Sequence, residues 1–294
     1  VTVYTVTVWR EIQGQWRFLM PGSAEVTVEL PGKLQGYHMA YTDSYCDVAT
    51  VSAMLSQLAA PEEVTYTLLA DVFLSPLNHF LRMAGCEPKF VLWLVGKTGS
   101  CKSTMAALML SFFGSFTAST LPMSFRDTAN SIQTQAHMLK DLPVVIDDFH
   151  PCGYQEQLKM TATAQSIIRD YGDRAGRGRL TADCSLMQAR PPQGNAIVTA
   201  EFPPDIGESG TARCFTIELK QGDVDLGTLT ALQTVAADGT LQRCMFAYTE
   251  WMREYFLYDE ETTQKFIKAL RALFEKYRGE FRSSGIHCHG RVAE

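Results

Sequence analysis

Several features that would assign a protein class at once are missing from this chain of 294 residues. No uninterrupted apolar run approaches the ~18 residues that a membrane-spanning helix needs, so we expect no membrane as partner. The eight cysteines form no C-x-x-C pair, which in a chain of this length indicates reduced thiols and a cytoplasmic protein. Neither an internal repeat nor a low-complexity segment is present, so the composition indicates a globular protein.

A strong excess of one charge is missing as well. The formal net charge is -6 and the apolar content is 46%, which is ordinary for a globular protein with one core or two domains. This mild acidity does not exclude nucleic acid as a partner, because a local basic loop can supply the binding field. The first residue is Val1, inside a strand-like pattern, rather than an initiating Met, so we expect an excised fragment.

The stretch from Lys89 to Gly114 predicts one buried strand, a tight turn and one helix. The apolar run from Phe90 to Val95 is short and rich in β-branched and aromatic residues, as in a central strand with both faces covered. Beyond the turn, apolar residues recur at helical spacing from Met105 to Phe112. Gly114 is a fitting terminator for that helix.

The turn itself fits the pattern G-x-x-x-x-G-K-[ST] at all but one position. Backbone N–H groups in such a loop wrap a phosphate, and the helix that follows adds partial positive charge. Lys102 would reach the β- and γ-phosphates of ATP, and the Ser103 hydroxyl would hold Mg²⁺. The alternative is a glycine-rich turn with an incidental lysine. The predicted nucleotide-binding residues are Gly96, Lys97, Thr98, Gly99, Ser100, Cys101, Lys102, Ser103 and Thr104.

Cys101 is the departure, because it stands where the pattern has its second glycine. A side chain at this position crowds the phosphate or requires a less favourable backbone angle. Either effect weakens nucleotide binding by about 1 kcal/mol.

Polar residues that end two later strands complete the predicted site. The mostly apolar run from Leu142 ends in two acids, Asp147 and Asp148. The first acid would bind Mg²⁺ through water, and the second would orient or deprotonate the attacking water. At the tip of the next strand Thr199 or Glu201 could touch the γ-phosphate or that water, and Asn195, which opens the strand, is the other candidate. The alternative is a set of solvated polar residues at loop edges.

Arginines supply two further hypotheses. Arg213 directly precedes an apolar strand and could reach the phosphate of a neighbouring subunit, with a surface ion pair as the alternative. A Gly/Arg-rich loop could follow a phosphate backbone, complete the active site or be merely solvated. Its arginines are Arg169, Arg174, Arg177 and Arg179, of which the last three are the predicted nucleic-acid contacts.

The other helices and strands are predicted from hydrophobic periodicity and from the residues that start or end such elements. Strands are expected within residues 1–30, and near 117–121, 142–149, 180–187, 196–201 and 214–219. Helices are expected over 43–85 with a break at Pro76, over 128–139 with Asp127 or Thr128 as cap, over 155–171, and within 226–278. The sequence 287–289, His-Cys-His, is only a weak metal-site hint.

This alternation of strands and helices predicts an α/β fold with a mostly parallel sheet and helices on both faces. We expect three segments: 1–87, β-rich and then helical, 88–222, the nucleotide-binding core, and 223–294, helical. The first segment is expected to belong to a larger N-terminal domain.

Taken together, the turn at 96–103, Ile146-Asp147-Asp148, Val198-Thr199-Ala-Glu201 and Ala212-Arg213-Cys-Phe215 resemble the ATPase core of AAA+ P-loop proteins. The likeness covers about residues 88–222 and points to helicase modules of phage, plasmid and mobile-element replication proteins, of the superfamily-three and MCM-like type. The segment 125–130, Phe-Arg-Asp-Thr-Ala-Asn, is similar to a segment of that group between the two nucleotide-binding elements.

The resemblance implies a ring, commonly a hexamer, that hydrolyses ATP with Mg²⁺ between subunits and pulls single-stranded DNA through its centre. It implies that Lys102 and Ser103 bind phosphate and metal, that Asp147 and Asp148 serve metal and water, and that Thr199 is the sensor. Arg213 would be the arginine finger acting in trans. Two alternatives stay open: an ATPase that remodels protein, and a nucleotide-gated DNA-binding scaffold with weak hydrolysis.

Overall fold

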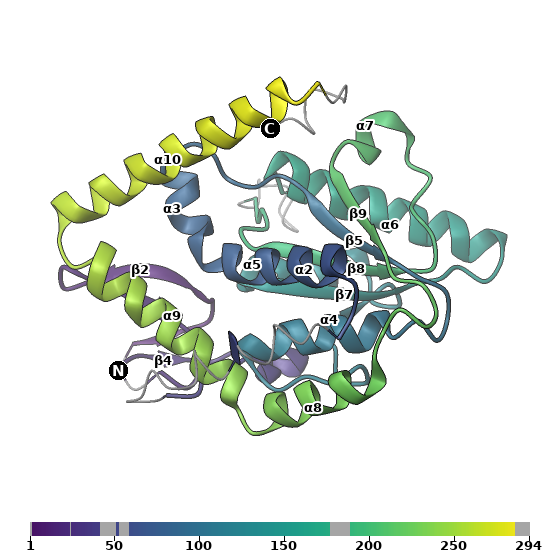
Figure 1. The fold of residues 1–294 in the computed structure, drawn as a ribbon, viewed down its shortest axis with the longest axis horizontal. Helices are drawn as coiled ribbons and strands as arrows, with labels where there is room; N and C mark the ends of the chain where they lie inside the picture. The colour runs from purple at the N-terminus through teal and green to yellow at the C-terminus, as the bar shows by residue number, and fades with distance from the viewer. Residues whose placement is uncertain (1, 24, 42–50, 53–58, 177–188, 286–294) are drawn as a thin grey trace, which may run out of the picture.

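A five-stranded sheet forms the centre of the molecule (Figure 1). The computed structural model describes residues 2–23, 25–41, 51–52, 59–176 and 189–285. The strand order is β6-β7-β8-β5-β9, and every neighbouring pair is parallel. The strands are β5 (Val91–Val95), β6 (Met123–Ser124), β7 (Pro143–Phe149), β8 (Asn195–Ala200) and β9 (Cys214–Glu218). The α/β fold with a parallel sheet, as predicted from the sequence, is confirmed.

Burial along the strands follows their place in the sheet. Every residue of β5 and β8 is buried, which is the pattern of central parallel strands covered on both faces. In β9, at the edge, only Ile217 is buried and Phe215 is exposed. Because β8 is inserted between β5 and β7, its end lies between the turn at 96–103 and the paired acids.

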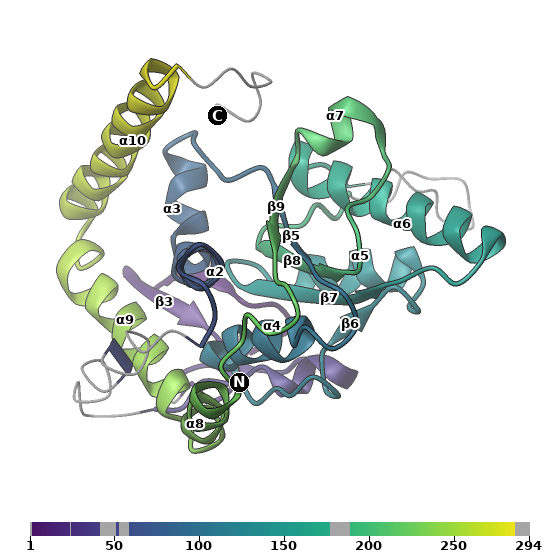
Figure 2. The ribbon, with the colours of Figure 1, turned by 45° about the vertical axis from the view of Figure 1, so that its right-hand side comes forward.

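Helices cover both faces of the sheet (Figure 2). Below it in that view, α4 (Lys102–Leu110) packs on β7 and β8. On the same side of the sheet, α2 (Glu62–Leu74) contacts both α4 and β9. On the other face α6 (Tyr154–Asp173) contacts β5, while α5 (Ala129–Met138) and the short α7 (Gly207–Thr211) contact α6. The Thr128 hydroxyl accepts a hydrogen bond from the Ser131 amide, which confirms it as the cap of α5.

Two local predictions have different outcomes. Pro76 lies in η2 (Ser75–Leu77), the 3-10 turn that separates α2 from α3 (Asn78–Met83), so the predicted break is confirmed. The strand predicted near 117–121 is wrong, because the Thr117 amide bonds the Thr120 hydroxyl and the Thr120 amide bonds the Thr117 carbonyl in a turn. The strand in this region is β6, and the strand expected over 180–187 falls outside the described residues.

The N-terminal segment is built of short strands. In order these are β1 (Val3–Tyr4), β2 (Val8–Ile12), β3 (Gln15–Leu19) and β4 (Thr27–Val28), followed by the 3-10 turn η1 (Gly32–Gly36). β2 and β3 form an antiparallel hairpin, and β1 pairs with β4 in parallel. The hairpin turn, Gln13-Gly14, has positive φ at both residues, as a two-residue turn of this twist requires.

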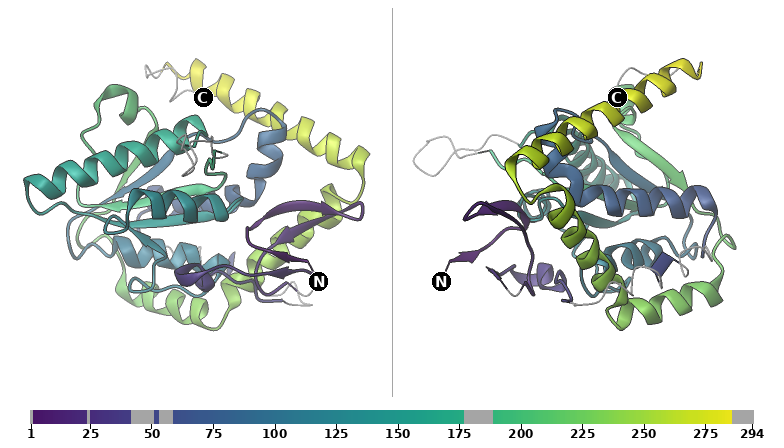
Figure 3. Two further views of the ribbon diagram at one scale, coloured as in Figure 1. Left: turned by 180° about the vertical axis from the view of Figure 1, so that it is seen from behind. Right: turned by 60° about the vertical axis from the view of Figure 1, so that its left-hand side comes forward.

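The C-terminal segment is helical, as expected. It consists of α8 (Leu226–Ala237), α9 (Thr240–Phe256) and α10 (Glu260–Ser283), while η3 (Ser111–Phe113) follows α4 and contacts α9. Asp225 and Asp259 cap α8 and α10 through their side chains. Figure 3 shows α9 and α10 along the flank that also carries the N-terminal strands.

Two hydrophobic clusters hold these parts together. The larger joins the sheet and its helices to Met20, Leu34 and Leu241. The smaller joins Trp9 of β2 and Phe80 of α3 to residues of α9 and α10. Burial of apolar surface therefore links the N-terminal and C-terminal segments to the core. The boundaries at 87/88 and 222/223 stay predictions.

Candidate functional site

The turn between β5 and α4 has a backbone that demands small residues at two positions. A Cβ on Gly96 would lie 2.5 Å from the Leu219 carbonyl oxygen, closer than any side chain can approach. Gly99 has φ +85°, in the left-handed region that favours glycine. The turn residues Lys97, Thr98 and Gly99 are exposed, while Lys102 and Ser103 open the first turn of α4. Backbone N–H groups and a helix N-terminus thus meet at the predicted phosphate site.

Cys101 has φ +64° and ψ +17°, a left-handed conformation at the N-cap of α4. Its carbonyl accepts the first helical hydrogen bond, from the Met105 amide at 2.9 Å. The side chain is half-buried and packs against the large hydrophobic cluster. Of the two consequences predicted for a side chain here, the less favourable backbone angle is confirmed. The glycine of the sequence pattern is explained by the same angle.

Next to the turn, two hydroxyl side chains converge on one carboxylate. The Ser103 hydroxyl donates to Asp147 Oδ1 at 2.7 Å, and the Thr199 hydroxyl donates to the same oxygen at 2.5 Å. These residues come from the start of α4 and from the carboxyl ends of β7 and β8. Parallel strands bring such ends to one edge of the sheet, where ligands of α/β proteins bind. A hydroxyl and a carboxylate at this spacing fit Mg²⁺, which also takes phosphate oxygens and waters.

A β-bulge in β7 sets the positions of Asp147 and Asp148. The register between β7 and β8 shifts between Ile146 and Phe149, so Asp147 and Asp148 form a bulge. Asp148 has φ +68°, and its amide donates to the Thr199 hydroxyl at 3.1 Å. Aspartate tolerates this left-handed conformation better than most residues do. The bulge separates the two acids, since Asp147 faces Ser103 while the Asp148 carboxylate is 44% exposed.

Sequence reasoning assigned no role to three residues at this edge. Arg126 Nη2 lies 3.6 Å from Asp148 Oδ2, and His150 Nδ1 lies 2.7 Å from Glu201 Oε2. The Gln221 amide donates to the Thr98 carbonyl at 2.6 Å. Arg126 belongs to the segment 125–130, which carries part of the resemblance. That segment was the one sequence signal that could have pointed to Arg126. His150 and Gln221 gave no signal, because their partners are distant in sequence.

The alternative sensor Asn195 is wrong. It opens β8 at the amino edge of the sheet, the edge opposite the turn at 96–103. Its amide donates to Asp71 Oδ1 at 3.0 Å and its carbonyl accepts from Asn78 at 2.9 Å, in a buried network. Burial raises the pKa of Asp71 to about 7, against a smaller opposing effect of the Asn195 hydrogen bond. Thr199, at the other end of the strand, is the residue that meets Asp147.

Arg213 lies at the amino edge, directly before β9. Its guanidinium is 9% exposed and pairs with Asp173 at 2.9 Å, and Nη1 donates to the Ser209 hydroxyl at 2.8 Å. The arginine therefore has partners within its own chain and lies at the sheet edge opposite the turn at 96–103. A role in trans stays a prediction that requires this ion pair to open.

Arg174 corrects one of the predicted nucleic-acid contacts. Its side chain is 8% exposed, and it donates to the Gly194 carbonyl at 2.6 Å and to the Pro88 carbonyl at 2.9 Å. Burial lowers the pKa of this guanidinium, with Glu87 opposing the shift. The residue ties α6 to the loops around the amino edge, so its guanidinium is not exposed to a phosphate backbone. Arg177 and Arg179 lie outside the described residues.

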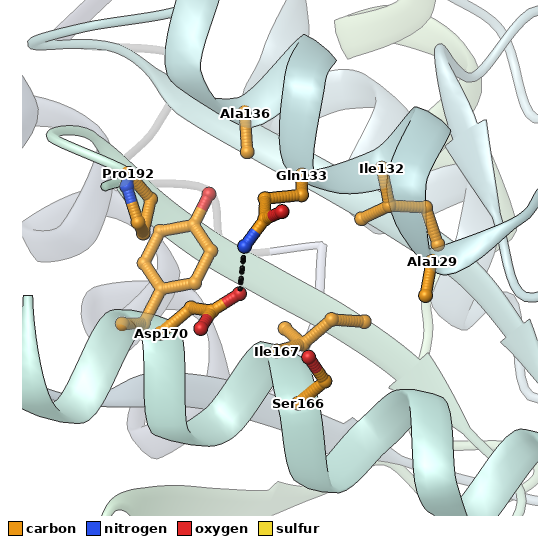
Figure 4. A pocket seen from close by; sticks show the side chains of 9 residues that line it. Ala129, Ile132, Gln133, Ala136, Ser166, Ile167, Asp170 and Pro192 are labelled. Atoms are coloured by element: carbon orange, nitrogen blue, oxygen red, sulfur yellow. Dashed lines mark hydrogen bonds between the residues drawn. The ribbon is translucent and has the colours of Figure 1, made fainter. Parts of the chain in front are cut away.

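A shallow pocket between α5 and α6 has room for about one water molecule (Figure 4). Gln133 donates to Asp170 across it at 2.9 Å, and Ile132 and Ile167 form part of its wall. This pocket belongs to helix packing and is too small for a nucleotide.

In the described part of the chain, no three His, Cys, Asp or Glu side chains are arranged to hold a metal. The 287–289 hint lies outside the described residues. No helix among those described has the length and apolarity needed to cross a membrane.

Comparison with solved structures gives a match over the whole chain. An active helicase, Cch of SCCmec type IV, superposes with a TM-score of 0.58 at 14% identity, covering 100% of this chain and 53% of the helicase. This chain shares the fold of that helicase. It spans about half the length of its match. No model of a protein family matches the sequence, and no curated protein does.

Two weaker structural similarities add no argument. The C-terminal region of NrS-1 aligns with a TM-score of 0.36 at 13% identity, covering 65% of this chain and 47% of the other. The JCV helicase aligns with a TM-score of 0.33 at 15% identity, covering 78% and 67%. The fold similarity therefore rests on the first match.

Proposed function

We propose that this chain is the ATP-hydrolysing module of a helicase or DNA translocase. The observation that carries the proposal is the convergence of Ser103, Thr199 and Asp147 beneath the phosphate-binding turn. Three elements from distant parts of the sequence supply these groups: β7 and β8 end, and α4 begins, at the same edge of the sheet. A chance cluster of solvated polar residues does not explain two hydroxyls donating to one carboxylate oxygen.

Each residue has a role that follows from its position. Lys102 supplies positive charge to the β- and γ-phosphates at the start of α4, where the helix dipole adds to it. Ser103 and Asp147 would hold Mg²⁺, which neutralises the charge that develops on the phosphates. Asp148, exposed and aimed away from Ser103, would accept a proton from the attacking water or orient it. Thr199 bonds both the Asp147 carboxylate and the Asp148 amide, so it would report the state of both acids.

We further propose that the module acts on single-stranded DNA as a ring of identical chains, with Arg177 and Arg179 as the nucleic-acid contacts. The sequence that follows α6 supports this, since Arg177 and Arg179 stand close together in a chain of net charge -6. Arg213 is the proposed finger for a neighbouring subunit. Arg174 is left out of the DNA contacts because it is buried.

Phosphate release from ATP–Mg²⁺, measured with and without single-stranded DNA, tests this function. Lys102→Ala and Asp147→Asn are the matched active-site variants, and each is expected to lower turnover by about 100-fold or more. Light scattering under the same conditions gives the particle mass, and growth to a ring with ATP is expected. DNA-independent turnover favours a protein remodeller, and binding without turnover favours a nucleotide-gated scaffold. No binding of ATP by the wild type overturns the proposal.

A further inference from the structure

Glu201, the first residue after β8, is bound at once by two parts of the candidate site. Its Oε1 accepts a hydrogen bond from the hydroxyl of Thr98, at the exposed tip of the phosphate-binding turn. Its Oε2 lies 2.7 Å from Nδ1 of His150, which follows the paired acids by two positions. Each carboxylate oxygen thus serves one partner, and the partners belong to different nucleotide-binding elements.

Thr98 is held from the opposite side as well. The Gln221 side chain donates to the Thr98 carbonyl at 2.6 Å from the loop that follows β9. Since β8 and β9 are the two neighbours of β5, the tip of the turn is anchored to the strand on each side. Glu201 differs from Gln221 in one respect, because its second carboxylate oxygen also contacts His150, at 2.7 Å.

The electrostatic setting of Glu201 agrees with this geometry. The hydrogen bond from Thr98 is the main cause that lowers the pKa of this carboxyl, and His150 and Lys102 lower it further. The group is therefore ionised at neutral pH. Its charge acts on the lysine that would receive the nucleotide phosphates, and on the histidine beside the acids of β7.

We infer that Glu201 is a positioning residue that couples the phosphate-binding turn to the end of β7. This inference rests on the proposed ATPase function and deepens it. A nucleotide that moves the tip of the turn pulls on Thr98, and the carboxylate passes the shift to His150. The acids at positions 147 and 148 then adjust together with the phosphates. Glu201 touches neither the phosphate nor the attacking water in this role.

A cycle of single and double variants tests the coupling in the full chain. Thr98→Val removes the hydroxyl donor, and His150→Ala removes the imidazole. The two are expected to be non-additive in kcat by roughly threefold or more, as groups within one network are. In a Glu201→Ala background the same two changes are expected to become additive, because the link is already gone.

Gln221→Ala is the matched control. It loosens Thr98 from the other side, so Gln221→Ala and His150→Ala are expected to combine additively. Glu201→Ala itself is expected to lower kcat roughly tenfold, with less than a threefold change in the Kd for a fluorescent ATP analogue with Mg²⁺. Glu201→Gln keeps the acceptor for Thr98 and is expected to recover part of kcat. If Glu201 had only a structural role, Glu201→Ala would instead lower the thermal midpoint of unfolding, and kcat would not fall more than the affinity for the ATP analogue.

The outcomes separate the inference from the function on which it rests. If the wild type does not bind the fluorescent ATP analogue, the proposed function is overturned, and the inference with it. If the wild type binds and hydrolyses ATP but Thr98→Val and His150→Ala are additive, the coupling role of Glu201 alone is overturned. Non-additivity that persists in the Glu201→Ala background also overturns it, since another path would then carry the coupling.

Discussion

Replacing Cys101 by glycine tests the backbone argument at the phosphate-binding turn. Cys101 has φ +64°, and an L-residue in this region is less stable than glycine by about 1–2 kcal/mol. Glycine gives back about 0.4–1 kcal/mol because it gains more freedom in the unfolded chain. Cys101→Gly is therefore expected to raise the free energy of unfolding by about 0.5–1 kcal/mol.

The side chain needs its own control, because Cys101 also packs against the hydrophobic core. Cys101→Ala removes the sulfur and keeps the Cβ, so it is expected to be less stable than Cys101→Gly. Cys101→Asn is expected to fall between them, since asparagine tolerates the left-handed region. For a chain of this size, 1 kcal/mol corresponds to a shift of about 2 °C in Tm.

Urea unfolding monitored by tryptophan fluorescence measures the three variants, and titration with a fluorescent ATP analogue measures binding. The left-handed angle is already present in the free chain, so its cost is met on folding and affinity is expected to change less than about twofold. Alanine as stable as glycine at position 101 would refute the argument from backbone angle. A tenfold gain in affinity for Cys101→Gly would instead show that the cysteine crowds the phosphate.

Three further predictions concern the amino edge of the sheet. Folding raises the pKa of Asp71 from 3.8 to about 7, so the free energy of unfolding falls as pH rises between these two values. In urea unfolding, Asp71→Asn is expected to remove about 2–4 kcal/mol of this pH dependence. An unchanged pH profile would contradict the burial argument. Arg213→Ala is expected to spare ATP binding and abolish ATP turnover. Asp173→Ala breaks the same ion pair and is expected to keep turnover. Equal turnover in the two variants would refute the role of Arg213 as an arginine finger. Arg174→Ala removes the donor to the part-buried carbonyls of Pro88 and Gly194 and is expected to cost about 1–3 kcal/mol of stability. A loss of DNA affinity without a loss of stability would restore Arg174 as a nucleic-acid contact.

The sequence by itself determined the elements that depend on local pattern. The run from Phe90 to Val95, the glycines of the turn and the helix from Lys102 follow from hydrophobicity, backbone angles and spacing. The cap at Thr128 and the break at Pro76 are also local, and the structure confirms both. At 117–121, hydroxyl side chains bonded the backbone in a turn instead of a strand, a competition that a propensity for strands does not register.

Only the tertiary structure decided which polar residues meet. Asn195 and Thr199 lie on one strand, with Thr199 as the predicted sensor and Asn195 as the other candidate. The two ends of a strand lie at opposite edges of the sheet, and of these two residues only Thr199 meets Asp147. Arg174 looked exposed in a Gly/Arg-rich loop, yet carbonyls brought from distant segments bury it. The contacts of Glu201 with Thr98 and His150 likewise join residues that are far apart in the chain. Periodicity reports the face and the element of a residue, whereas the strand order of the sheet fixes which ends become neighbours.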